Sequence, residues 1–140
     1  MSDFLIWALR ISGAGLVLLA VLHVPIGRRL RWREDAAKME PTNEAIFHVH
    51  NFFICVTIAL MGLPSLVEPE IFVEKSRAGL WFSTMIAAFW VMRLYCQFFV
   101  YPKALWHGKR MESFFHWFFA VVWVFLSVTY GLAAAGQWGG

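Results

Sequence analysis

Four apolar segments of about 20 residues each constrain this chain more than any other feature of its sequence. They cover residues 4–24, 45–66, 78–100 and 113–135. A helix rises about 1.5 Å per residue, so each segment is long enough to cross a hydrocarbon layer of about 30 Å. None alternates in polarity as a membrane strand would. The sequence therefore predicts an all-α integral membrane protein, an up-down-up-down bundle of four transmembrane helices forming a single domain over residues 1–140.

The composition excludes most other classes of protein. Hydrophobic residues make up 60% of the chain and charged residues 15%, with a mean hydropathy of +0.61. A soluble domain has about 45–50% apolar and about 25% charged residues, so a soluble or disordered chain is not expected. The two cysteines, Cys55 and Cys96, lie in apolar segments and cannot form the framework of a secreted disulfide protein. The net charge of +3 is small and concentrated in two connections, which does not indicate nucleic-acid binding.

The distribution of lysine and arginine predicts the orientation in the membrane. The connections at 27–44 and 101–112 together carry eight of these residues, whereas the connection at 67–77 carries only Lys75 and Arg77. Basic connections remain on the cytoplasmic side of a membrane. We therefore expect a plasma membrane of the bacterial inner-membrane type, with both termini outside and loops 27–44 and 101–112 in the cytoplasm.

Polar and ionisable residues of the apolar segments gather toward the cytoplasmic side. All four predicted helices contribute to this polar layer, which the outer half of the membrane lacks apart from Arg10. A charge that faces lipid is costly, so we expect these side chains to point into the bundle. The residues of the polar layer are His23, Glu44, His48, His50, Asn51, Arg93, Gln97, Glu112 and His116.

Helical spacing groups some of these residues on common faces. Glu44 and His48 are four residues apart, as are Glu112 and His116, so each pair shares one face of its helix. His50 follows His48 by only two residues and points roughly the opposite way. The two histidines of this His-Val-His sequence therefore cannot chelate one ion while they remain helical.

Metal or haem binding is the chemistry that this residue set favours, because histidine is the commonest transition-metal ligand. Histidines on facing helices would clamp a b-type haem, with Arg93 meeting a propionate, and a redox-related role would follow. The candidate cofactor-binding residues are His48, His50, His116 and Arg93. The candidate ligands of a metal ion are His23, His48, His50, His116, Glu44 and Glu112.

A pocket for a lipophilic molecule is the first alternative. Small residues at 12–15 and 131–136 would let the helices approach closely in the outer half of the membrane. The helices would then diverge in the inner half and leave a cavity around the polar layer. Such a cavity would suit a lipid- or quinone-binding membrane enzyme, with His and Glu moving protons and Arg93 binding an oxygen.

Two non-catalytic interpretations remain open beside these. The chain is small enough to be an accessory or assembly subunit of a larger membrane complex, and its many aromatic residues would suit packing on other membrane subunits or on a second copy. The polar layer would also serve as a purely structural cluster, because buried His and Gln hydrogen-bond between helices. The expected partners are the lipid bilayer, other membrane subunits or a homo-oligomer, and a lipophilic small molecule.

Overall fold

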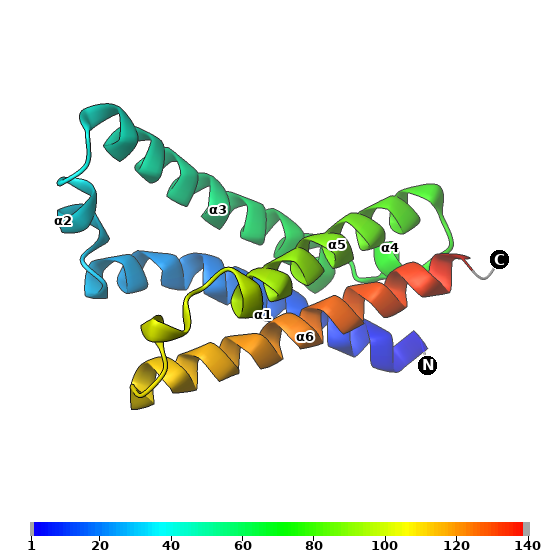
Figure 1. Cartoon of the computed structure of the whole chain (residues 1–140). Helices are drawn as coiled ribbons and strands as arrows, with labels where there is room; N and C mark the ends of the chain where they lie inside the picture. The colour runs from blue at the N-terminus through cyan, green and yellow to red at the C-terminus, as the bar shows by residue number, and fades with distance from the viewer. Residues whose placement is uncertain (1, 139–140) are drawn as a thin grey trace. The chain divides into compact units, whose positions relative to one another are not determined.

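The computed structural model describes residues 2–138, and every regular element in that range is a helix (Figure 1). Four of these helices are long and apolar enough to cross a membrane, which confirms the predicted set of segments. They are α1 (Ser2–Arg29), α3 (Pro41–Val67), α5 (Arg77–Phe99) and α6 (Arg110–Trp138). Shorter helices occupy the connections: α2 (Trp32–Ala36), α4 (Glu70–Val73) and the 3₁₀ helix η1 (Lys103–Leu105).

Prolines explain the two largest differences from the predicted helix ends. The first helix was expected to stop at Val24, but it continues through Pro25 to Arg29. Proline removes one hydrogen bond and can kink a helix without ending it. The second helix begins at Pro41 rather than at residue 45, because a proline in the first turn needs no intrahelical partner for its missing N–H.

The basic connections are also more ordered than the predicted loops. Residues 27–44 include the end of α1, all of α2 and the first turn of α3, and residues 101–112 include η1 and the first turn of α6. The last helix consequently covers 110–138 instead of 113–135, and the third covers 77–99 instead of 78–100.

Contacts divide the chain into two compact units. One unit is Arg10–Glu68, and the other joins Met1–Leu9 to Pro69–Gly140. We call them the N-terminal unit and the C-terminal unit.

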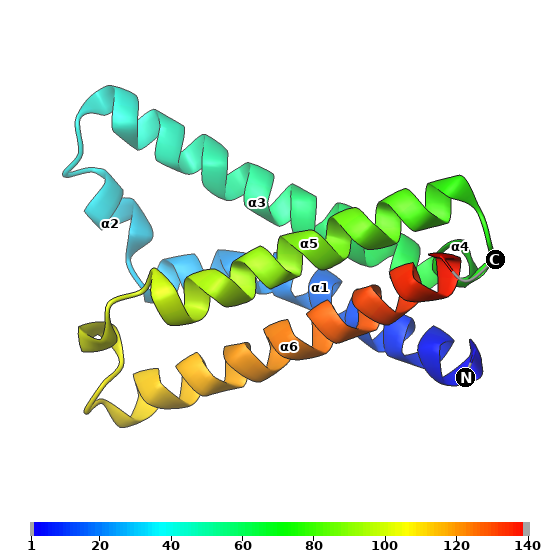
Figure 2. The same ribbon diagram turned by 45° about the vertical axis from the view of Figure 1, so that its right-hand side comes forward.

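Helices α1 and α3 of the N-terminal unit meet at two glycines. A Cβ on Gly13 would lie 2.5 Å from the backbone N of Leu66 and 2.6 Å from the backbone O of Gly62. A Cβ on Gly62 would lie 2.8 Å from the Cβ of Leu16. The two backbones are therefore in direct contact, and the helices diverge from this crossing toward α2 (Figure 2). Within this unit, the expected close approach is confirmed at Gly13, whereas a Cβ on Gly15 would meet nothing within 4 Å.

The C-terminal unit is built on the hairpin of α5 and α6, which pack against each other along their lengths. Trp90 and Trp123 stack between these helices, with ring centroids 4.9 Å apart and an interplanar angle of 12°. Phe72 of α4 packs edge-on against Tyr130 of α6 at 5.7 Å. The expected contact at Gly131 is not found, because a Cβ there would meet nothing within 4 Å.

One glutamine ties the end of α6 to the α4–α5 connection. The side-chain amide of Gln137 donates to the backbone oxygens of Phe72 and Glu74, and its oxygen accepts from the backbone N–H of Ser76. The hydroxyl of Ser76 in turn accepts from the N–H of Gly79 and caps the start of α5.

Candidate functional site

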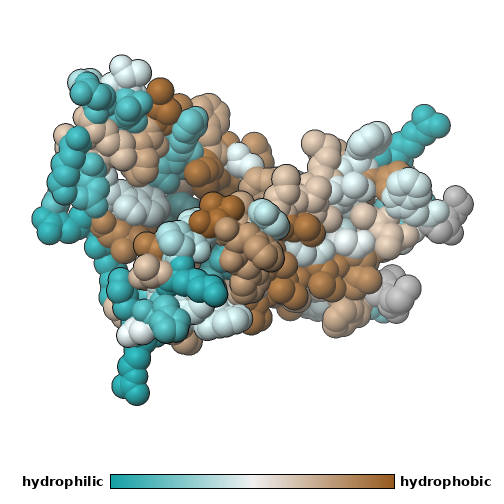
Figure 3. Space-filling model, viewed as in Figure 1, coloured by the Kyte–Doolittle hydropathy of each residue, from teal (hydrophilic) through white to brown (hydrophobic). Residues whose placement is uncertain are grey.

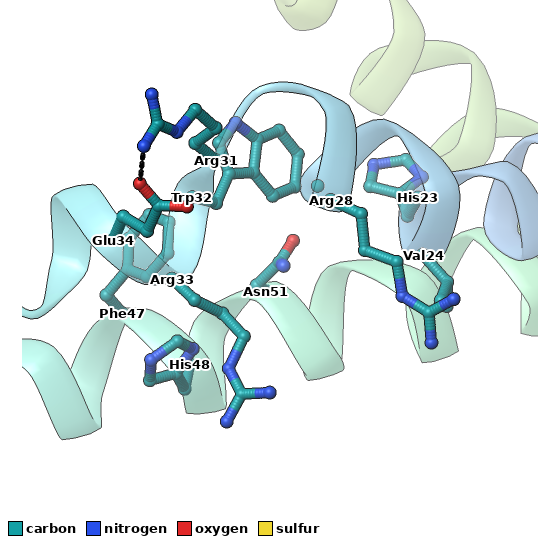
Figure 4. Close-up of a pocket in the computed structure, with 11 residues that line it drawn as sticks. His23, Val24, Arg28, Arg31, Trp32, Arg33, Glu34, Phe47, His48 and Asn51 are labelled. Carbon is teal, nitrogen blue, oxygen red and sulfur yellow. Dashed lines mark ion pairs between the residues drawn. The ribbon is translucent and has the colours of Figure 1, made fainter.

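A pocket of about 470 Å³ opens in the N-terminal unit, where α1 ends and α3 begins (Figure 4). Helix α2 closes one side of it. Hydrophilic side chains gather over α2 and the adjoining helix ends of this unit (Figure 3). The pocket is thus a basic and aromatic space at the ends of two long apolar helices.

Trp32 forms the aromatic part of the pocket together with Phe47. The two rings meet edge-on at 6.4 Å, and Trp32 meets the ring of His23 at the same distance. The indole lies against α1 at Gly27, where a Cβ would approach a ring carbon to 3.0 Å. The absence of a side chain at residue 27 therefore leaves room for the indole.

The turn that presents Trp32 depends on an unusual backbone conformation. Arg31 precedes α2 with φ 56° and ψ 35°, in the left-handed region, and it is the one residue other than glycine with positive φ in the described chain. This conformation costs an ordinary residue about 1–2 kcal/mol. Strain of this kind concentrates at functional sites, where the surrounding structure holds it.

Three arginines line the pocket, which gives it an excess of positive charge. Arg31 pairs with Glu34, as the dashed line in Figure 4 marks. Arg28 and Arg33 make no ion pair within the described chain, and Arg33 points from α2 toward α3. Three positive charges and one negative charge leave a formal charge of +2, which favours an anionic ligand.

Two of the predicted histidines, His23 and His48, face this pocket. The Nδ1–H of His23 donates to the backbone oxygen of Leu19 at 2.7 Å, so in the neutral tautomer of this ring the lone pair is on Nε2. The Nε2 of His48 lies 3.9 Å from a carboxylate oxygen of Glu44, as their spacing predicted.

The other predicted residues of α3 divide between the pocket and the surface. Asn51 lines the pocket, and its amide points toward Trp32. His50 is exposed and does not line the pocket. Over residues 2–138, no three side chains of His, Cys, Asp or Glu are grouped closely enough to hold a metal ion. A metal site formed by the predicted ligands stays a prediction.

A second polar cluster lies in the C-terminal unit and centres on Gln97 of α5. Its amide nitrogen is 3.0 Å from Nδ1 and 3.1 Å from the backbone oxygen of His116, which belongs to α6. Its amide oxygen accepts from the guanidinium of Arg93 at 3.2 Å and from Nε1 of Trp123 at 3.4 Å. Arg93, Gln97 and His116, three residues of the predicted polar layer, are thus joined by hydrogen bonds.

Aromatic rings enclose the charged and polar groups of this cluster. The guanidinium of Arg93 lies 5.0 Å from the ring centre of Trp123 and 5.3 Å from that of Tyr101. Such cation–π contacts hold a charge where few polar partners are at hand. The ring of Trp106 stacks on His116 at 4.2 Å and 13°.

The predicted residues therefore fall into two groups. His23, Glu44 and His48 lie in the N-terminal unit, whereas Arg93 and His116 lie in the C-terminal unit. Glu112 is exposed in the first turn of α6. A haem held by both His48 and His116 stays a prediction.

Two tryptophans belong to these groups without having been predicted. Trp32 and Trp106 lie close to the ends of apolar segments, a position that is typical of an aromatic belt at the membrane surface. In the sequence, the role of Trp32 could have been found from Gly27, five residues earlier, because the indole lies against this glycine.

Comparison with protein-family models, curated proteins and solved structures finds no match for this chain.

Proposed function

We propose that this chain is an integral membrane protein that binds the phosphate headgroup of a lipid-soluble molecule in the pocket of its N-terminal unit. The observation that carries this proposal is the pair of arginines, Arg28 and Arg33, that line the pocket without an ion-pair partner in the described chain. Guanidinium groups bind phosphate through two parallel hydrogen bonds, which makes arginine well suited to this ligand.

The four long helices are proposed to cross a plasma membrane of the bacterial inner-membrane type. Both termini lie outside in this orientation, and α2 and η1 lie on the cytoplasmic side, because their connections carry most of the lysines and arginines. The pocket then opens at the cytoplasmic surface, at the depth where lipid headgroups lie. Arg28 and Arg33 are placed for the headgroup, and the apolar faces of α1 and α3 for the hydrocarbon part.

The other lining groups extend this complementarity. Trp32 and Phe47 offer rings to the apolar part of a ligand, and Asn51 and His48 offer polar groups. A volume of about 470 Å³ is of the size of a small-molecule site, about 300–1,000 Å³. Hydrogen bonds to charged groups contribute about 1.5–3 kcal/mol each, and because Arg28 and Arg33 are both exposed we expect the low end of this range, about 3 kcal/mol for the two together.

Equilibrium binding to the detergent-solubilised protein tests this role. The ligands are short-chain phosphatidic acid, the zwitterionic phosphatidylcholine of the same chain length, and inorganic phosphate. We expect saturable binding of phosphatidic acid, weaker binding of phosphatidylcholine and weak binding of inorganic phosphate, which lacks the apolar part. The double variant Arg28→Gln/Arg33→Gln should lower the affinity for phosphatidic acid at least 100-fold.

The matched control removes two arginines that do not line the pocket. Arg29 and Arg110 are exposed, as Arg28 and Arg33 are, but they do not line the pocket. The variant Arg29→Gln/Arg110→Gln therefore lowers the net charge by the same amount as Arg28→Gln/Arg33→Gln. This control should bind phosphatidic acid as the unaltered protein does. Equal losses in the two double variants would refute a specific site, because they would indicate attraction by net charge alone.

Haem or metal binding remains a second candidate because of the hydrogen bond of His23. A ligating histidine usually donates its other ring N–H to a carboxylate, a backbone oxygen or a water, and the Nδ1 of His23 does so to Leu19. His48 lines the same pocket and would be the second ligand, with Arg28 or Arg33 meeting a propionate.

Visible absorption and metal content of the protein purified in mild detergent decide this candidate. A Soret band, or a stoichiometric metal, that is lost in His23→Ala and kept in His50→Ala would establish it. His50 is the matched control because it lies on α3, is exposed and does not line the pocket. Absence of both signals in folded protein would reject this candidate and leave the headgroup site untouched.

A further inference from the structure

We propose that the cluster of Gln97, His116 and Trp106 in the C-terminal unit is a second, separate binding site, which donates hydrogen bonds to a carbonyl oxygen of a lipophilic molecule. The site does not depend on the headgroup pocket, because it uses different residues of a different unit.

The orientation of the Gln97 amide follows from three of its hydrogen-bond contacts. Arg93 and the indole of Trp123 have only N–H groups to offer, so the amide atom facing them must be the oxygen. The other amide atom faces the backbone oxygen of His116, which can only accept. A flipped amide would therefore place donor against donor on one side and acceptor against acceptor on the other.

The fixed amide also fixes the tautomer of His116. The second hydrogen of the Gln97 amide points to Nδ1 of His116, which must accept it through its lone pair. A neutral imidazole that accepts at Nδ1 carries its hydrogen on Nε2. His116 thus presents an N–H donor at Nε2, not the lone pair that a metal ion or a haem iron requires.

This donor is buried and lacks a partner. His116 is 7% exposed, and its Nε2 makes no hydrogen bond to any residue that the structure describes. Buried donors without an acceptor are rare in proteins because each costs free energy. The structure therefore points to an acceptor that binds at this nitrogen.

A second unpartnered donor lies on the neighbouring ring. Nε1 of Trp106 is also buried and makes no hydrogen bond within residues 2–138. Trp106 stacks on His116 with nearly parallel rings, so the Nε1–H of Trp106 and the Nε2–H of His116 lie on two rings that are in contact. A carbonyl oxygen, which has two lone pairs, is an acceptor for N–H groups of this kind.

The surroundings favour a neutral, apolar ligand over an ion. Two aromatic rings pack edge-on against the ring of His116: Phe98 at a centroid distance of 5.9 Å and Trp117 at 5.5 Å. The charge of Arg93 is directed to the Gln97 oxygen and to two aromatic rings, not to Nε2 of His116. A quinone and the ester group of a lipid both present a carbonyl oxygen in an apolar frame, and this is the chemistry that the site recognises.

Two measurements on the full chain in detergent test this site. The first is the nitrogen NMR spectrum of the protein with ¹⁵N-labelled histidine. We expect the His116 ring to show an unprotonated Nδ1 and a protonated Nε2. A protonated Nδ1 would overturn the inference, since such a nitrogen cannot accept from the Gln97 amide, and this result does not depend on any variant folding.

The second measurement is binding of a decyl-substituted benzoquinone or of dioctanoylglycerol, followed through tryptophan fluorescence and through the Nε2–H resonance of His116. Binding of either probe that shifts this resonance supports the site, and the probe that binds identifies the source of the carbonyl group. His116→Phe should weaken that binding at least tenfold. His107→Ala, which alters an exposed ring beside Trp106, should leave it unchanged. Unchanged affinity in His116→Phe, or no binding of either probe, would overturn the inference.

Discussion

The crossing of α1 and α3 gives a sharp test of the packing, because the helix supplies its own control two residues away. A Cβ on Gly13 would lie 2.5 Å from the backbone N of Leu66, whereas ordinary contacts begin near 3.4 Å. The obstructing atoms are backbone atoms, which cannot rotate aside as a side chain can. Gly13→Ala must therefore push the helices apart by about 0.9 Å, the difference between these distances.

The change that Gly13→Ala causes in the free energy of unfolding is the sum of two opposing effects. Overpacking of a tight contact costs about 1–3 kcal/mol. Alanine stabilises a helix interior by about 0.5–1 kcal/mol relative to glycine. Gly15→Ala gains only the second effect, since a Cβ there meets nothing within 4 Å. The two variants should therefore differ by the steric cost alone, about 1–3 kcal/mol, with Gly13→Ala the less stable.

Reversible unfolding in mixed micelles of a mild detergent and dodecyl sulfate measures this difference through circular dichroism. Gly62→Ala should resemble Gly13→Ala, because its Cβ would lie 2.8 Å from the Cβ of Leu16. Equal stabilities of Gly13→Ala and Gly15→Ala would refute the close crossing.

Three further predictions concern the connections between the long helices. Gln137→Leu removes the hydrogen bonds to Phe72 and its neighbours and should lower the free energy of unfolding by about 1–3 kcal/mol in the same assay; unchanged stability would contradict the role of this glutamine. Arg31→Gly should relieve about 1 kcal/mol of left-handed strain, so a loss of stability would count against that backbone conformation. The hydrogen bond and charge of Lys38 hold the pKa of Asp35 below its ordinary value. The pair therefore stabilises the folded protein above the ordinary pKa of an aspartate, and this stabilisation is lost as the pH falls through the lowered pKa. Lys38→Gln should raise the pKa of Asp35 in a carbon NMR titration, and an unmoved pKa would show that the pair does not form.

The long helices were predictable because their signal is local. An apolar run of about 20 residues is evident in any window of the sequence, and the four helices follow these runs. The ends were less predictable, because Pro25 and Pro41 can each end, kink or begin a helix depending on the neighbouring hydrogen bonds.

The pocket was harder to predict because it depends on contacts between segments. His23 and His48 were recognised as chemically active types, but their shared pocket depends on the turn at Arg31 and on the place of Trp32 against Gly27. Neither feature leaves a periodic pattern. The role of His116 was equally hidden, since its tautomer depends on the amide of Gln97, nineteen residues away.

The most direct test of the headgroup site is a distance measurement between arginine and phosphorus. The protein, ¹³C-labelled at the arginine guanidinium carbons, is placed in bilayers that contain phosphatidic acid, and the dipolar coupling to ³¹P is recorded by solid-state NMR. A bidentate pair with N···O distances of about 2.7–2.9 Å should give strong coupling. We predict that Arg28→Gln/Arg33→Gln removes most of this coupling and that Arg29→Gln/Arg110→Gln retains it. Coupling that survives in the first variant, or falls equally in both, would contradict a phosphate site in this pocket.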